Sequence, residues 1–261
     1  MAETARATPD VCKDDLFDYV LRLGDNALIT GQRLAEWVRN APSVELDMAF
    51  GNFALDHVGQ ARMLLTYAGE IEGKGRDEDG IAFLRDGEAF RNLLITELPN
   101  GDFGQTMLRL FFYSAWLKLL YTELLKSSDK QLAAIAEKAL KEVSYHLKHS
   151  ADWVIRLGDG TDESHSRMEN AVHELWPYTA ELFMGDALEA RVAAAGIGVD
   201  VTSLRDAWDE LVDEVFARAT LQRPDVSWQP EGGRRGMHTE HLGYLLAEMQ
   251  YMQRTYPGCT W

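Results

Sequence analysis

Two short stretches of the sequence hold residues that could bind metal ions. The first is LDHVGQA, with Asp56, His57 and Gln60, and the second is KEVSYHL, with Glu142 and His146. Both are close to the Glu-x-x-His pattern by which helical bundles bind a pair of iron ions. The chemistry therefore depends on which of these side chains the helices turn inward.

Both stretches lie in long segments with helical periodicity, where an inward stripe advances in alternating steps of three and four residues. Asp56 and Glu142 stand one residue off these stripes, about 100° around the helix from the inward positions. The stripes read Leu46, Phe50, Phe53, His57, Gln60 and Leu64 in the first segment, and Leu132, Ala136, Ala139, Val143, His146 and Ser150 in the second.

Two further helical segments complete the set that a di-iron site needs. Their stripes read Val20, Leu23, Ala27, Thr30, Leu34 and Trp37, and Met107, Phe111, Ser114, Lys118 and Tyr121. Two iron ions in a dry core require about four carboxylates to balance their charge. The mid-bundle positions supply none, since they are Ala27, His57, Gln60, Ser114, Val143 and His146. We expect a degenerate site, with no bound metal and no catalytic residue in this chain.

The periodicity predicts an all-α fold with four long helices in an antiparallel bundle. These helices are expected at about Asp14–Arg39, Ser43–Tyr67, Phe103–Lys126 and Lys130–Leu157, and shorter ones at Ile81–Leu98, Ser166–Phe183 with a break at Pro177, Leu204–Leu221, and after Thr239. Ser43 and Asp102 are expected to cap the second and third long helices. No strand pair stands out, and AAAGIGVDV is the best strand candidate. We expect a flexible tail over residues 1–13 and a single helical domain over 14–261.

The bulk composition excludes several classes of function. A net charge of −16 disfavours nucleic acid and anionic membranes as partners, because both repel an acidic surface. No apolar run reaches the length of a transmembrane helix. Cys12 and Cys259, two separated thiols without metal-site spacing, indicate a reducing cytoplasm.

Several longer segments carry a family resemblance. The chain resembles the PaaC-like structural subunits of bacterial ring 1,2-phenylacetyl-CoA epoxidase, which have a ferritin-like fold and bind no metal. The resemblance covers nearly the whole chain beyond the first dozen residues. It is carried by YVLRLGDNALITGQRLAEW, LDHVGQAR, TELPNGDF, KEVSYHL, RLGDGTDES, LWPYTAELF and GGRRGMHTEHLGYLLAEMQYMQR.

The resemblance implies a function that the spacing of the residues alone does not indicate. The family complex forms a ring epoxide from phenylacetyl-CoA, O2 and reducing equivalents. Its catalytic sister protein holds the di-iron centre, and a separate reductase holds flavin and an iron–sulfur cluster. The sister reads Asp-Glu-x-Gly-His where this chain has Asp56 to Gln60, so the metal-binding Glu and His become His57 and Gln60. The resemblance implies that this chain holds no cofactor and supports the catalytic sister; self-association remains open.

Two alternatives remain open beside this interpretation. One is a self-sufficient di-metal oxidase with displaced ligands, namely Asp56, His57, Glu142 and His146. The other is a non-catalytic acyl-CoA-binding module, in which Arg234 and Arg235 of the loop EGGRRG contact the phosphates of coenzyme A or an acidic partner. His238, Glu240 and His241 are ligand-type residues too, but Thr239 and Glu240 suit a helix N-terminus better.

Overall fold

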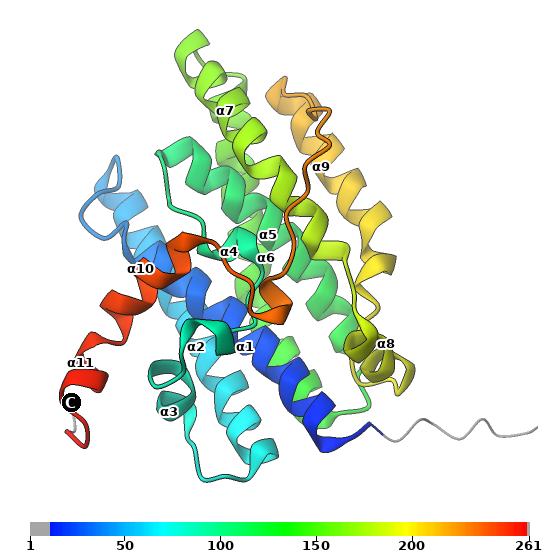
Figure 1. Ribbon diagram of the computed structural model, residues 1–261. Coiled ribbons are helices and arrows are strands. Elements are labelled where there is room, and N and C mark those ends of the chain that lie inside the picture. Colours follow the sequence, from blue (N-terminus) through cyan, green and yellow to red (C-terminus); the bar gives the residue numbers. More distant parts are fainter. Residues whose placement is uncertain (1–10, 260–261) are drawn as a thin grey trace, which may run out of the picture.

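Four long helices form the centre of the molecule in the computed structural model, which describes residues 11–259 (Figure 1). Helix α1 pairs with α2 as one antiparallel hairpin and α5 pairs with α6 as a second, and a long crossover, residues 73–102, joins the two hairpins. The helices span Lys13–Ala35 (α1), Val44–Glu72 (α2), Phe103–Leu124 (α5) and Lys130–Gly158 (α6). The described residues contain no strand, so the predicted all-α, ferritin-like bundle is confirmed.

Shorter helices pack around this bundle. Helices α7 and α9 lie against α5 and α6 on one side, while α10 lies beside α1 and α4 on another and α11 follows α10 (Figure 1). The short elements are α3 (Glu78–Phe83), α4 (Leu94–Glu97), α7 (Asp162–Leu175), α8 (Ala187–Ala194), α9 (Arg205–Ala219), α10 (Glu240–Met249), α11 (Tyr251–Thr255) and the 3-10 turns η1 (Gly87–Ala89), η2 (Trp176–Phe183), η3 (Val201–Leu204) and η4 (Gly233–Arg235).

Local capping chemistry places the starts of the long helices. Side chains of Ser43, Asp102 and Asp129 accept hydrogen bonds from backbone amides in the first turns of α2, α5 and α6. These bonds satisfy donors that no carbonyl inside the helix can reach. The predicted caps at Ser43 and Asp102 are therefore confirmed. Thr239 stands at the N-cap position of α10, but its side chain makes no capping bond.

Four predicted segments can be compared with the structure. The expected helix Ile81–Leu98 is broken into α3, η1 and α4, because the segment folds around buried polar side chains of α1. The strand candidate AAAGIGVDV is instead the end of α8 and the turn after it. The expected break near Pro177 is present, with α7 ending at Leu175 and continuing as a 3-10 turn. Of the expected tail, residues 1–10 lie outside the described residues, and Cys12 caps α1 at Lys13.

The predicted stripes face the core, with one exception. Every member of the α1, α2 and α6 stripes is buried, as are four of the five members in α5. Lys118 in α5 is only half-buried. The opposite, outer face of α2 contains two glycines, Gly51 and Gly59, and each destabilises the middle of a helix by about 1 kcal/mol relative to alanine.

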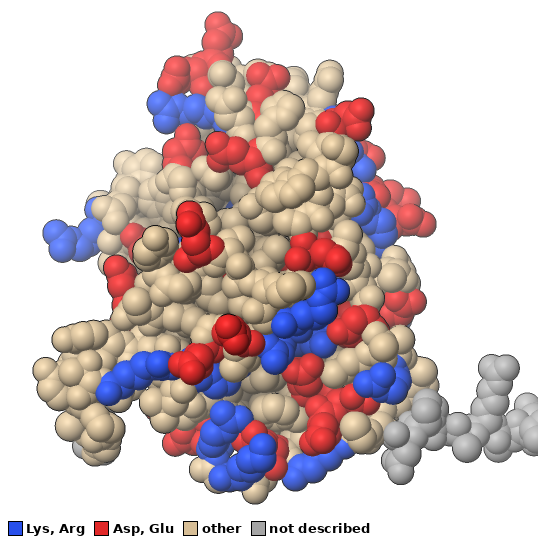
Figure 2. Space-filling model, in the orientation of Figure 1, with Lys and Arg blue, Asp and Glu red and all other residues tan. Residues whose placement is uncertain are grey.

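Charge is mixed over the molecular surface. Acidic and basic side chains are interspersed with wide neutral areas on the face that Figure 2 shows, so the net charge of −16 does not gather into one acidic area on that face. Across residues 11–259, no helix has the length and apolar character that crossing a bilayer requires.

Candidate functional site

The six mid-bundle positions named from the sequence lie in the core. Their side chains are at most 1% exposed: Ala27, His57, Gln60, Ser114, Val143 and His146. They come from α1, α2, α5 and α6, one or two from each helix. The imidazole rings of His57 and His146 lie 5.1 Å apart across the α2–α6 contact. The structure thus buries all six positions and brings His57 and His146 together across the contact between α2 and α6.

Two polar pairs join α2 to α6 at this level. Nε2 of His146 lies 2.9 Å from Oδ2 of Asp56, and the Gln60 amide donates to Oε2 of Glu142 at 2.9 Å. The pairs are one helical turn apart, as expected for antiparallel helices. Asp56 and Glu142 therefore each contact a side chain of the neighbouring helix. The sequence pattern does not reveal these contacts, because it shows only that both residues lie off the stripe.

His57 lies in a different environment from His146. Its side chain is fully buried, and neither ring nitrogen has a hydrogen-bond partner among the described residues. Burial lowers the pKa of His57 well below its ordinary value of 6.5, and the neighbouring His146 lowers it further. His57 is therefore a neutral imidazole at pH 7.

This burial predicts a pH effect on stability. A base whose pKa is depressed in the folded state contributes stability that is fully present above the unfolded pKa, near 6.5, and is lost as the pH falls below it. The free energy of unfolding should then drop by up to about 1.4 kcal/mol per pH unit below that point. In His57→Leu this part of the drop should be absent, as measured by urea unfolding at a series of pH values. His173, which is exposed, gives the control His173→Gln; if wild type and His57→Leu showed parallel curves, the neutral assignment would be wrong.

Two tyrosines of α5 border Gln60 and His57. The Tyr121 hydroxyl donates to Oε1 of Gln60 at 3.3 Å, and the Tyr113 ring lies 6.1 Å from His57. Burial raises the pKa of both phenols above the ordinary value of 10.0, so both remain protonated. The Tyr113 hydroxyl lies beside Thr30, although the pair does not meet ordinary hydrogen-bond geometry.

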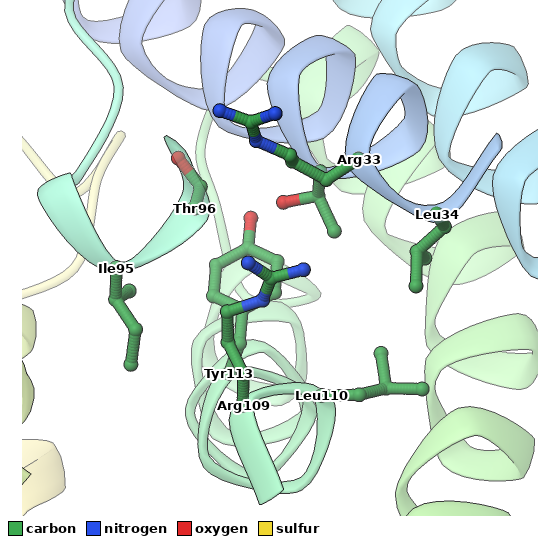
Figure 3. A pocket seen from close by; sticks show the side chains of 8 residues that line it. Arg33, Leu34, Ile95, Thr96, Arg109, Leu110 and Tyr113 are labelled. Carbon is green, nitrogen blue, oxygen red and sulfur yellow. The ribbon is translucent and has the colours of Figure 1, made fainter. Parts of the chain in front are cut away.

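A small cavity adjoins this layer between α1, α4 and α5 (Figure 3). Its volume is about 10 Å³, which suits one water molecule. An apolar cavity that binds benzene is about 150 Å³, so no phenyl ring fits here. The cavity is lined by Thr30, Arg33, Leu34, Ile95, Thr96, Arg109, Leu110 and Tyr113. Burial lowers the pKa of Arg109 to about 9, with the Arg33 charge as a second cause, and backbone carbonyls of residues 98 and 99 accept from its guanidinium.

The donor set at the centre does not fit a di-iron site. The inward positions provide two imidazoles, one amide and one hydroxyl, and no carboxylate. Asp56 and Glu142 are each engaged with a side chain of the facing helix. Among the described residues, no group of three or more His, Cys, Asp or Glu side chains is arranged to hold a metal ion. Of the four displaced ligands of the oxidase alternative, Asp56 pairs with His146, whereas Glu142 pairs with Gln60 and His57 has no hydrogen-bond partner among the described residues, so the four do not share one coordination sphere.

The loop EGGRRG binds a carboxylate of this chain. The backbone amides of Gly232 and Gly233 donate to Oε1 of Glu181 at 2.9 and 2.8 Å, and Leu94 donates to Oε2 at 2.7 Å. Glu181 is 2% exposed, and burial raises its pKa despite these bonds and the nearby Arg234. The glycine-rich backbone that could have contacted a phosphate is thus already occupied.

The two loop arginines have different environments. Arg234 is buried: its Nε lies 2.9 Å from Oε1 of Glu189, and its Nη1 donates to the Glu181 carbonyl at 2.6 Å. Arg235 is exposed and pairs with Glu231 at 3.3 Å. The expectation that both arginines present guanidinium groups outward is corrected for Arg234, because that group is used inside the fold. Only Arg235 remains accessible to a ligand or a partner.

The last segment of the family resemblance contributes a histidine, His238, whose side chain is 7% exposed. Nδ1 of His238 lies 2.8 Å from Oε2 of Glu97, and Nε2 lies 3.0 Å from the Phe90 carbonyl. Burial alone would lower its pKa, but the Glu97 carboxylate outweighs this and raises it. Glu97 also accepts from the Thr239 amide at 2.6 Å, so it ties the start of α10 to α4.

Sequence reasoning missed four buried acids that organise the perimeter of the bundle. They are Asp25, Glu97, Glu181 and Glu189, each at most 6% exposed. Asp25, Glu97 and Glu189 each face an Arg or His of this chain, and the Glu181 carboxylate accepts from backbone amides. Three of the four, Asp25, Glu97 and Glu181, lie in segments that carry the family resemblance. Their position in the segments of the resemblance was the available signal, but their partners are distant in sequence.

Comparison with known proteins identifies the family of the chain. The family model described as "Phenylacetic acid catabolic protein" matches residues 1–261. A curated relative, one of the subunits of 1,2-phenylacetyl-CoA epoxidase from Escherichia coli (strain K12), is 49% identical over 248 residues. The match covers 95% of this chain and 100% of that relative.

Proposed function

The chain belongs to the phenylacetic acid catabolic protein family, and on this premise we propose that it is a non-catalytic structural subunit of a phenylacetyl-CoA epoxidase. The observation that carries the proposal is the absence of any carboxylate from the inward mid-bundle positions of the described helices. Charge compensation is what a buried metal pair needs most, and this core lacks it. The similarity to an epoxidase subunit along its whole length supports the same role.

In this proposal a partner subunit carries out the catalysis. A ferritin-like sister subunit supplies the di-iron centre, and a separate reductase with flavin and an iron–sulfur cluster supplies electrons. The present chain stabilises the sister through contact and adds no reacting group. Its place is the cytoplasm, where exposed free cysteines such as Cys12 and Cys259 stay reduced.

Metal analysis of purified protein tests whether the iron is held by the partner subunit and not by this chain. We expect the chain alone to carry almost no iron, and its co-expressed complex with the catalytic homologue to carry about two iron ions per pair, the number a di-iron bundle holds. Glu142→Ala should leave the iron content of the complex unchanged, because Glu142 pairs with Gln60 rather than with a metal ion.

The opposite result would support the displaced-ligand oxidase. Two iron ions in the isolated chain, lost in Glu142→Ala, together with turnover of phenylacetyl-CoA by this chain alone, would overturn the proposal. Failure of the two chains to co-purify would remove the supporting role. The structural role is favoured because Asp56 and Glu142 are each already paired across the α2–α6 contact.

A further inference from the structure

The outer face of α2, opposite His57, is an apolar stripe. Val44, Met48, Leu55 and Val58 are 73%, 65%, 70% and 38% exposed. At about 100° per residue, these four side chains fall within about 80° of one another around the helix. Between Glu45 and Arg62, the exposed positions of α2 carry no charge. A neutral stripe of this kind on a chain with net charge −16 marks an interaction surface.

Gly51 and Gly59 lie along this stripe without a contact that explains them. A Cβ atom added at either position would meet no described atom within 4 Å. The other glycines of the four long helices differ, since a Cβ at any of them would meet an atom of another segment within 3.0 Å: Gly24, Gly31, Gly69, Gly104 and Gly158. Glycine weakens a helix interior, and close approach of another backbone is a common reason for its presence. The two notches at Gly51 and Gly59 therefore fit a helix from outside this chain.

The order of large and small residues along the stripe is self-complementary. If a second α2 crosses antiparallel, with the two-fold axis between residues 53 and 54, position 48 of one helix meets position 59 of the other. Met48 then faces the Gly59 notch, and Leu55 meets position 52, which lies beside the Gly51 notch. The two-fold symmetry makes each of these contacts occur twice. A two-fold interface requires such reciprocal contacts between one patch and itself.

The charges at the two ends follow the same symmetry. In this register, position 45 of one helix lies level with position 62 of the other, so Glu45 and Arg62 come to the same height along the pair twice, about 100° apart around the helix and within reach only through their long side chains. Both side chains are exposed; within the chain, Arg62 makes an exposed ion pair with Glu78 at 3.1 Å. An acid at one end and a base at the other would repel in a parallel pairing and attract in an antiparallel one.

From these features we infer that the α2 stripe, Val44 to Arg62, is a two-fold interface with a second copy of this chain. The antiparallel register is favoured by the two glycine notches, by the large residues Met48 and Leu55, and by the charges of Glu45 and Arg62. The inference does not depend on the proposed epoxidase role, since it uses only side chains of this chain.

Sedimentation equilibrium of the full chain tests the interface. Wild type is expected to form a dimer, and Leu55→Glu should weaken association on the order of a hundredfold, because it places two buried charges close to the symmetry axis. Leu84→Glu is the matched control, since Leu84 is 61% exposed and lies outside the stripe. Gly51→Ala should raise the melting temperature of the monomer, because alanine is more favourable than glycine inside a helix. The same substitution should weaken the dimer, and a variant that is more stable but associates less shows that Gly51 acts in the packing between chains.

Charge reversal tests the register itself. Glu45→Arg and Arg62→Glu should each weaken the dimer, whereas the double variant, or a mixture of the two single variants, should restore it. Restoration occurs only if the two side chains meet across the axis. A wild-type chain that is monomeric throughout, or a dimer indifferent to Leu55→Glu, overturns the inference. If the isolated chain is monomeric and Leu55→Glu abolishes co-purification with the catalytic homologue, the stripe belongs to that homologue and the second copy is the wrong occupant.

Discussion

Replacing Asp25 with alanine is expected to lower the free energy of unfolding by about 3–5 kcal/mol. Asp25 is fully buried in the middle of α1, where its carboxylate accepts two bonds from the Arg85 guanidinium and one from the Arg91 amide at 2.8 Å. Removal leaves the Arg85 charge, itself 6% exposed, without its counter-ion. Urea unfolding followed by far-ultraviolet circular dichroism measures the change.

An exposed ion pair provides the control for Asp25. Lys126 and Glu123 lie 2.7 Å apart, but their side chains are 70% and 41% exposed. Glu123→Ala should therefore cost less than about 1 kcal/mol. Joint replacement by Asp25→Leu and Arg85→Met should recover most of the lost stability, because removing both charges leaves neither unpaired. A cost below about 1 kcal/mol for Asp25→Ala would show that the pair is hydrated and not part of the core.

Arg234→Ala is expected to destabilise the chain by about 3 kcal/mol, toward the lower end of the range for a broken buried pair. Glu189 would lose its 2.9 Å partner, and the Glu181 carbonyl would lose its donor. Arg22, with its Nη1 3.6 Å from Glu189, compensates part of that loss. Thermal and urea unfolding of the full chain give the value.

The adjacent Arg235 provides a closely matched control. Its side chain is 53% exposed, so Arg235→Ala should change stability by less than about 0.5 kcal/mol. Titration with coenzyme A then tests the acyl-CoA-binding alternative on a folded protein. If Arg235→Ala leaves the affinity unchanged, this loop has no role in coenzyme A binding. Equal destabilisation by the two alanine variants would contradict the buried ion pair.

These predictions share one electrostatic basis. The buried acids of this bundle lie at its perimeter, where Asp25 faces Arg85, Glu97 faces His238, and Glu189 faces Arg234. Each charge is thus balanced by a basic side chain of the same chain. At the centre, where a catalytic homologue would place acids balanced by metal ions, the inward positions of the described helices hold no carboxylate. A structural subunit built in this way does not need a metal ion to fold.

The sequence by itself determined the helical architecture and the content of the bundle centre. Hydrophobic periodicity is local, so the stripes through His57 and His146 and the caps at Ser43 and Asp102 could be assigned from neighbouring residues. The core contains nearly all the side chains that the stripes predicted, Lys118 being the exception. The all-α fold followed because burial of one face per helix dominates the folding free energy.

The tertiary structure alone decided which polar side chains are partners. Asp56 and His146 are separated by 90 positions in the chain, and Glu181 and Gly233 by 52, so no local pattern links them. The same long-range bonds broke the expected helix Ile81–Leu98 and placed Arg234 inside while its neighbour Arg235 stayed outside. Periodicity reports which face of a helix is buried, whereas the partner of a buried charge depends on which segments the whole fold brings together.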